Sequence, residues 1–210
     1  MNISIANSDD SKEILGIMMS VFAKTEPTSM ALNIPDEHYR RYAEYIIDKG
    51  IYQQQIFIAK NDKVITGYAI WEDYEEPLVL GLPPNKDIYK MIEPELEFVN
   101  LLENELDNII DFDKSKCMRI SQAAVLPHYQ GQGIAKALIN FIIKENSIII
   151  SEKNYKFVIA DCTVENSFTI LNKLGFDSII EINYVDFTCN GFNPYKNLNG
   201  IRRLMLKKNF

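Results

Sequence analysis

The sequence predicts an α/β fold built on a mixed sheet. Its 210 residues are 47% hydrophobic and 24% charged, which is ordinary for a globular protein and enough for a core without disulfides. Strand and helix patterns alternate with short links through the second half, as expected for neighbouring parallel strands. Two hairpin patterns, one at each end of the sheet, add antiparallel pairs. Because no repeat or Gly/Ser-rich linker interrupts the sequence, we expect residues 1–210 to form a single domain.

The first quarter of the chain predicts a short strand and two helices. The strand is Ile3–Ala6, and the polar run Ser8–Ser11 supplies an N-cap after it. Apolar residues recur at helical spacing from Ile14 to Phe22, so one face of the first helix should be buried. This helix should end before Pro27, because the residue preceding a proline avoids helical geometry. A second helix is predicted over residues 35–50.

The middle of the chain predicts a hairpin and then an acidic helical insertion. Gln55–Lys60 and Val64–Asp73 have strand patterns and are separated by a short polar turn. Three prolines mark residues 75–85 as a loop. The helical insertion, about 76–112, is rich in Glu and Leu between Lys86 and Ile110. We expect its acidic face to be a solvated helix surface.

The second half supplies the remaining strands and helices. The predicted strands are Met118–Leu126, Lys156–Cys162, Asp177–Phe187 and Ile201–Lys208. The predicted helices are Gly131–Asn146 and Asn166–Leu174, and Gly175 suits a left-handed stop after the second.

Composition argues against several classes of protein. The formal net charge of −7 disfavours nucleic-acid and anionic-membrane binders, which need a basic face. Three scattered cysteines and two histidines predict neither a disulfide framework nor a metal site. No signal peptide begins the chain, and no apolar run approaches the ~20 residues of a membrane span. The expected location is therefore the cytoplasm.

One segment carries a recognisable binding chemistry. A predicted strand runs through a turn with Pro127 into Gly131 and Gly133, and a helix opens directly after them. Glycines let the backbone approach a ligand, and the helix start offers free N–H donors and the positive end of the dipole. These features indicate a phosphate cradle. The dinucleotide fingerprint is absent, because Lys136 stands where its third glycine would be.

The segment resembles motif A of the GNAT superfamily of acyl-CoA-dependent N-acyltransferases. Gln130, Gly133 and Ala135 fit the family pattern Gln/Arg-x-x-Gly-x-Gly/Ala. Asn166–Phe176 resembles the second GNAT motif, a helix that ends in Lys-Leu-Gly-Phe about forty residues later. The resemblance implies the GNAT fold, with a mixed, mostly antiparallel central sheet of about seven strands and helices on both faces.

Two further stretches resemble the insect-type arylalkylamine N-acetyltransferases. Val21–Pro27 is similar to their Phe-x-x-Asp-Glu-Pro stretch, and Ile182–Phe187 is similar to their Tyr-x-Asp-Tyr strand. The resemblance implies direct acetyl transfer from acetyl-CoA to a small primary amine of arylalkylamine or polyamine type, by a monomer or homodimer without a metal. The alternatives are acetylation of a peptide, a protein amino group or an aminoglycoside, and a non-catalytic acyl-CoA-binding module.

The resemblance also implies which residues bind acetyl-CoA. Backbone groups of residues 123–125 would hold the pantetheine arm where a bulge splays the strand, and the Val125 N–H would also stabilise the oxyanion. The expected cofactor-binding residues are Ala123, Ala124, Val125, Gln130, Gly131, Gln132, Gly133, Ile134, Ala135, Asn166, Ser167 and Lys173.

The expected catalytic residues are Val125, Glu26 and Ser167. Glu26 matches the proposed catalytic glutamate of the insect-type group, and the alternative is a carboxylate that simply faces solvent after the first helix. Leu171 stands where many GNAT enzymes have a tyrosine general acid. Ser167 is the candidate acid instead, unless it is only a helix-start serine.

Two weaker catalytic candidates and an expected amine pocket complete the site. Tyr184 is a second candidate acid, and Cys162 would allow an acyl-enzyme, although a buried small residue is the simpler interpretation. The amine pocket is expected from residues 26–45, 71–110 and 184–203. Aromatic residues that would line this pocket or lie in the core are Tyr39, Tyr42, Trp71, Tyr74 and Phe192.

Overall fold

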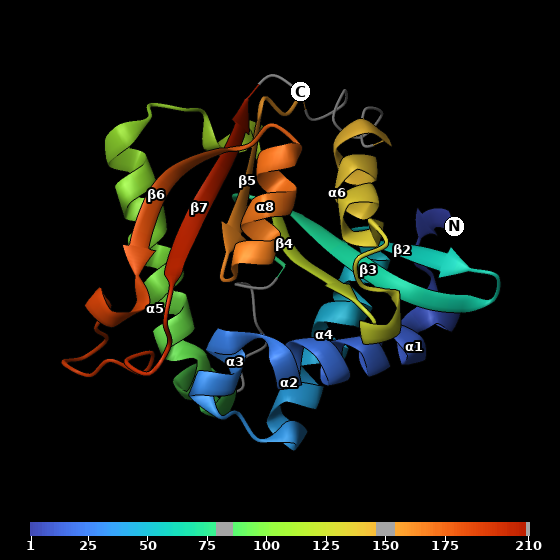
Figure 1. The fold of residues 1–210 in the computed structure, drawn as a ribbon, viewed down its shortest axis with the longest axis horizontal. Coiled ribbons are helices and arrows are strands. Elements are labelled where there is room, and N and C mark those ends of the chain that lie inside the picture. The colour runs from blue at the N-terminus through green and yellow to red at the C-terminus, as the bar shows by residue number, and fades with distance from the viewer. Residues whose placement is uncertain (79–85, 146–153, 209–210) are drawn as a thin grey trace.

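The computed structural model describes residues 1–78, 86–145 and 154–208, which build a seven-stranded sheet with helices on both faces (Figure 1). The strands, in sheet order, are β1 (Asn2–Ile5), β2 (Ile56–Asn61), β3 (Val64–Asp73), β4 (Cys117–Val125), β5 (Phe157–Cys162), β7 (Ile201–Lys208) and β6 (Asp177–Asn183). The helices are α1 (Ser11–Ile17), α2 (Ala23–Thr25), α3 (Pro27–Leu32), α4 (Asp36–Tyr52), α5 (Lys86–Ile109), α6 (Ile134–Glu145) and α8 (Glu165–Lys173). The predicted fold class is confirmed.

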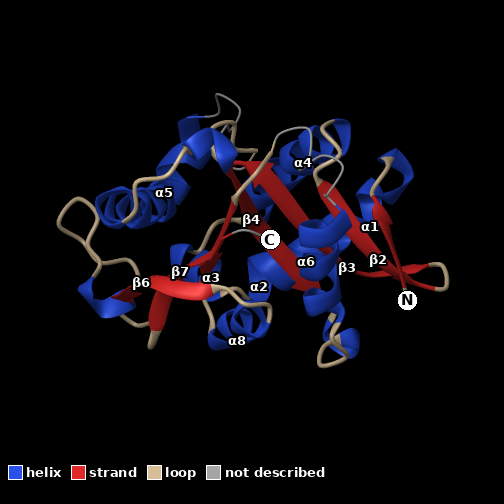
Figure 2. Cartoon of the chain, turned by 90° about the horizontal axis from the view of Figure 1, so that it is seen from above, coloured by secondary structure: helices blue, strands red, loops and turns tan. Residues whose placement is uncertain are grey.

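The sheet divides between β4 and β5. This is the parallel pair; the other strand pairs of the described sheet are antiparallel. The β4–β5 pairing covers Cys117–Ile120 and stops there, whereas β4 stays paired with β3 as far as Val125. A register shift opposite Ile70 and Trp71 makes Ser121 the extra residue of a bulge. Figure 2 shows β3 and β4 on one side of the molecule and β6 and β7 on the other.

Alternating strand residues build separate cores on the two faces of the sheet. Phe57 and Ala59 of β2 pack on the face that α6 and α8 cover, together with Val158 and Met205 from the other half. The residues between them, such as Ile58, pack under α1 and α4 instead. On that same second face, α5 covers β6 and β7 through a third cluster.

Two elements differ from the sequence prediction. The predicted strand 177–187 ends at Asn183, and a short 3-10 turn, Tyr184–Asp186, follows. The helix α3 was not predicted, because Pro27 was interpreted only as a stop signal. Proline is also favoured at the first position of a helix, where its missing N–H costs nothing, and Pro27 begins α3 in this way. Parts of the predicted 75–85 loop and of the 131–146 helix lie outside the described residues.

Candidate active site

The glycine loop after β4 has the open geometry that a phosphate cradle needs. Gly131 and Gly133 have φ angles of 76° and 79°, a region that favours glycine. A Cβ built on either residue would meet nothing within 4 Å. These glycines therefore satisfy backbone geometry and leave the space above the loop free for a ligand.

Side chains of the loop and the start of α6 hold this geometry. Gln130 donates from Nε2 to the Val125 carbonyl at 3.0 Å, and Gln132 donates to the His128 carbonyl at 3.3 Å. The first backbone bond of α6 runs from Ala137 N to Gly133 O at 2.9 Å. The N–H groups before Ala137 thus form the unpaired first turn of the helix, beside the two glycines. The residues fit a bound pyrophosphate.

The end of β4 presents backbone donors towards the division of the sheet. Leu126 N donates to the carbonyl of Thr66, a residue of β3, at 2.9 Å. Because hydrogen-bonded and non-hydrogen-bonded pairs alternate in an antiparallel ladder, the N–H groups of Ala123 and Val125 point away from β3. They face the side from which β5 has separated. The Val125 carbonyl faces the same way and accepts the Gln130 side chain.

A cavity of about 160 Å³ lies where β4 and β5 part, on the face of the sheet that α3, α4 and α5 cover. Ser121 and Gln122 of β4 and Asp161 and Thr163 at the end of β5 line it, so it reaches the place where the two strands part. Apolar residues of α5 form one wall, among them Ile92 and Val99. The cavity and the glycine loop therefore approach the β4–β5 division from different sides.

Glu26 lines this cavity and caps α3. Its carboxylate accepts hydrogen bonds from Thr28 N at 3.1 Å, Thr28 Oγ1 at 2.8 Å and Ser29 N at 2.6 Å. Its extended backbone, with φ −76° and ψ 122°, is the usual N-cap geometry. The helix start thus fixes the carboxylate at the cavity wall, whereas the sequence left a solvent-facing side chain open as the alternative.

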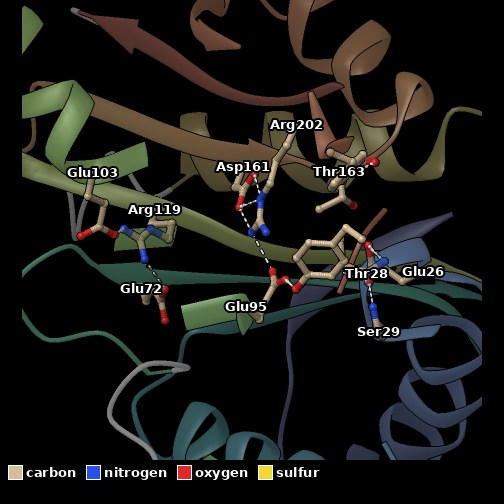
Figure 3. Close-up of polar contacts among 12 residues, drawn as sticks. Glu26, Thr28, Ser29, Glu72, Glu95, Glu103, Arg119, Asp161, Thr163 and Arg202 are labelled. Atoms are coloured by element: carbon tan, nitrogen blue, oxygen red, sulfur yellow. Dashed lines mark hydrogen bonds and ion pairs between the residues drawn. The ribbon is translucent and has the colours of Figure 1, made fainter. Parts of the chain in front are cut away.

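Two buried arginines form ion pairs with carboxylates that line the same cavity (Figure 3). Arg202 binds Asp161 through Nε, at 2.9 and 3.0 Å, and Glu95 through Nη2, at 2.6 Å. Its guanidinium also lies 4.6 Å from the centre of the Phe98 ring. Burial by itself would lower the pKa of Arg202, but the two carboxylates outweigh it and raise that pKa, so the residue stays charged.

Arg119 forms the second cluster. It contacts Glu103 of α5, and its Nη1 lies 3.7 Å from Glu72 Oε1 of β3. Glu72 also accepts a hydrogen bond from Leu78 N at 2.7 Å. Burial would lower the pKa of Arg119, yet Glu103 and Glu72 raise it overall. The expectation of a solvated acidic face on the 76–112 insertion is wrong for Glu95 and Glu103, because both turn inward to pair with buried arginines.

Tyrosines complete the cavity and its surroundings. Tyr39 and Tyr42 line it and meet edge to face, with ring centres 5.7 Å apart. Burial and then the nearby Glu26 carboxylate raise the pKa of Tyr39, which keeps its phenol neutral. Tyr184 donates to the Thr163 carbonyl at 2.9 Å, and Tyr195 donates to Glu95 at 2.9 Å. These bonds connect the 184–200 loop to the cavity walls.

The remaining predicted residues lie on or near α8. Ser167, in its first turn, donates to the Val164 carbonyl at 2.8 Å, and Asn166 beside it is exposed. Lys173 is in the last turn, at the end of the helix away from Ser167. Leu171 is buried in the core under α6 and α8. Cys162 is fully buried, and burial raises the pKa of its thiol to about 12, so it is poorly suited to attack a thioester.

The candidate aromatic residues have different locations. Tyr39 and Tyr42 line the cavity, as the sequence suggested. Trp71 packs in the opposite core with Tyr155, and Tyr74 packs beside Phe112. Phe192 is exposed.

Sequence analysis missed the two arginine clusters. Arg119 interrupts an apolar stretch of β4, between Met118 and Ile120, and a charged side chain at such a position is rarely buried without partners. That interruption was the available signal for Arg119, whereas Arg202 is one of several basic residues in β7 and carried none. The partners Glu95 and Glu103 resemble the other acidic residues of α5 in the sequence and carried no such signal.

Comparison with known proteins agrees with this geometry. Residues 24–170 match the model of the Acetyltransferase (GNAT) family. The structure resembles the C-terminal condensation domain of Ebony in complex with beta-alanyl-dopamine (TM-score 0.79, 13% identity, 99% of this chain and 98% of that one). It also resembles the Drosophila melanogaster polyamine N-acetyltransferase that forms N-acetylagmatine, with a TM-score of 0.74 and 15% sequence identity over 99% of both chains. A third similar structure is mosquito arylalkylamine N-acetyltransferase-like 5b, with a TM-score of 0.73 and 15% identity over 99% of both chains.

No curated protein sequence matches the chain. Among the described residues, no helix has the length and apolar character needed to cross a bilayer. The family match covers more than half of the sequence, and the fold agrees with it over nearly the whole chain. The chain is therefore a member of the GNAT acetyltransferase family.

Proposed function

We propose that this protein is an acetyl-CoA-dependent N-acetyltransferase that transfers an acetyl group directly to a small primary amine of arylalkylamine or polyamine type. The observation that carries the proposal is the meeting of two sites at the β4–β5 division. An open glycine loop lies on one side, and a cavity with a fixed carboxylate lies on the other.

The glycine loop is proposed to bind the pyrophosphate of acetyl-CoA. Loop and first-turn N–H groups from Gly131 to Lys136 would donate to it, and backbone N–H groups of Ala123 and Val125 would bind the pantetheine arm. Asn166 and Ser167 at the start of α8 are proposed as further contacts, and Lys173 as a more distant one. Bound there, the cofactor supplies an activated acetyl thioester.

Glu26 is proposed to remove a proton from the amine. An alkylammonium is not a nucleophile at neutral pH, so the amine must lose a proton directly or through one water. The three donors from α3 fix the Glu26 carboxylate at the cavity wall, where it also attracts a cationic amine. The Val125 N–H is proposed to stabilise the developing oxyanion.

Ser167 is proposed to deliver a proton to the departing thiolate. Its hydroxyl belongs to the first turn of α8, directly after the end of β5. Leu171 is buried and apolar, so the position that many GNAT enzymes give to a tyrosine acid contributes no proton here.

The proposed function is tested by thiol release from acetyl-CoA over a panel of amines, peptides and aminoglycosides. We expect turnover with small primary amines and much weaker turnover with peptides. Tight binding of CoA without turnover of any acceptor would instead identify a non-catalytic acyl-CoA-binding module.

A pair of substitutions separates the proposed catalytic role of Glu26 from its capping role. Glu26→Ser keeps a good N-cap but has no carboxylate, and Glu26→Gln keeps the size but has no basic oxygen. We expect both to lower kcat at neutral pH by about 10²–10⁴-fold while the melting temperature stays close to that of the unchanged protein. If Glu26→Ser retained normal kcat, the carboxylate would be a helix cap only.

A further inference from the structure

The cavity wall carries more negative charge than one amine can balance. Among the described residues, five carboxylates and two guanidiniums line it, which leaves a formal excess of three negative charges. The carboxylates are Glu26, Glu72, Glu95, Glu103 and Asp161, and the guanidiniums are Arg119 and Arg202. Each arginine is shared by two carboxylates, so each cluster keeps one uncompensated negative charge.

In each cluster, at least one carboxylate is more exposed than the arginine that it binds. The Arg202 side chain is 1% exposed, whereas its partners Glu95 and Asp161 are 29% and 21% exposed. Arg119 is 9% exposed and its partner Glu103 is 22% exposed. A ligand would therefore meet the carboxylates of Glu95, Asp161 and Glu103 before the arginines. Glu72, at 1% exposure, is more deeply buried than Arg119.

The three negative centres lie in a row. Figure 3 places Glu26 at one end, the Arg202 cluster in the middle and the Arg119 cluster at the other end. Glu95 and Glu103 are eight residues apart on α5, which corresponds to about 12 Å along the helix. Apolar side chains, including Leu96 and Val99, line the cavity between them. Such a wall suits a flexible methylene chain with a charge at each end.

One uncharged group also points to an N–H donor as the ligand. Tyr39 is 3% exposed and lines the cavity, and its hydroxyl oxygen lies close to Ser29 but completes no well-formed hydrogen bond in the described part of the chain. A neutral phenol oxygen beside Glu26 can accept a hydrogen bond from an ammonium group. Burying this oxygen without a partner costs free energy, which such a ligand would recover.

We propose that the preferred acceptor is a diamine. One amine lies at Glu26 and receives the acetyl group, and a second cationic group lies along α5 between Glu95 and Glu103, where the negative charge of both carboxylates attracts it. This inference rests on the proposed function and selects within it, since an arylalkylamine offers one positive charge and leaves the excess negative charge of the two arginine clusters unbalanced. Glu95 and Glu103 are thus specificity-determining residues.

The wild-type protein tests this directly. 1,5-Diaminopentane and hexylamine have nearly the same length and differ in one terminal group, ammonium or methyl, and 2-phenylethylamine represents the arylalkylamines. We expect kcat/KM for the diamine to exceed both others by about tenfold or more. Equal or better use of hexylamine or 2-phenylethylamine would overturn the inference. If no amine releases CoA thiol, the proposed function itself fails, so the two failures are distinguishable.

Substitutions on α5 locate the second cation. Glu95→Gln and Glu103→Gln should each reduce the diamine-to-hexylamine ratio by about tenfold, chiefly by raising KM for the diamine. Glu97→Gln removes the same charge from the exposed side of α5 and should leave the ratio unchanged. An unchanged ratio in both inward variants would contradict the assignment. If a variant does not fold, the wild-type comparison still decides.

Discussion

At the scale of single residues, the two glycines of the loop and Glu26 differ in how readily the sequence identifies them. Gly131 and Gly133 are recognisable from their context, a strand that leads into them and a helix that follows, and the positive φ angles explain why glycine is needed. Glu26 was identified as a candidate, but its role as the cap of α3 depends on a helix that the sequence analysis did not predict. Glu95 and Glu103, the partners of the arginines, belong to the site only through tertiary contacts.

Charge at the glycine loop should decide whether CoA binds. Gly133→Asp would place a carboxylate beside the proposed pyrophosphate, and Gly133→Asn would impose a similar backbone strain without the charge. We expect the Asp variant to lose at least about 100-fold in CoA affinity by calorimetry and the Asn variant to lose much less. Normal affinity in the Asp variant would contradict the placement of the pyrophosphate.

At the scale of elements, α5 is held over the sheet by both aromatic packing and charge. Phe98 is fully buried and stacks on Phe187, with ring centres 4.1 Å apart, while Glu95 and Glu103 bind arginines of β7 and β4. The sequence predicted this helix well from its Leu and Glu content. It did not predict which acidic residues turn inward, because that depends on where the arginines of distant strands lie.

Phe98 should anchor α5 and therefore one wall of the cavity. Phe98→Ala removes a fully buried ring, and we expect a loss of about 3–5 kcal/mol in the free energy of unfolding, measured with urea. Asn100→Ala on the exposed side of the same helix should change it by less than about 0.5 kcal/mol. Similar losses in the two variants would show that α5 is not anchored through Phe98.

At the scale of the whole molecule, negative charge is concentrated where the amine is proposed to bind. The net charge is −7, and the cavity alone has a formal excess of three negative charges. Hydrophobic patterns predicted most of the strands and helices, and the resemblance to the GNAT family implied a mixed sheet of about seven strands with helices on both faces. The order of the strands was not predicted. The cavity was not predicted either, because it arises between helices whose relative positions only the folded chain defines.

The negative electrostatic potential of the protein should make kcat/KM for a cationic amine depend on ionic strength. Raising NaCl from about 0.01 M to about 1 M shortens the screening length from about 30 Å to about 3 Å. At saturating acetyl-CoA, we expect kcat/KM to fall for 1,5-diaminopentane and to fall less for hexylamine, because a dication gains more from an acidic cavity. A diamine whose kcat/KM does not change with salt would contradict this electrostatic attraction.

The division between β4 and β5 creates an edge strand in the interior of the sheet. After Ile120, β4 has a partner on one side only, like the outermost strand of an ordinary sheet. Exposed edges are templates for adding another extended chain, which is how proteins recruit peptides and also how they aggregate. Here the edge lies within the molecule, between helical layers. A strand of another protein does not fit there easily, but the narrow pantetheine arm that is proposed to bind carries amide groups and can lie along it. The backbone groups that make no sheet hydrogen bonds on this side are the ones proposed to bind acetyl-CoA. Binding of the cofactor should therefore raise the free energy of unfolding as well as begin the reaction.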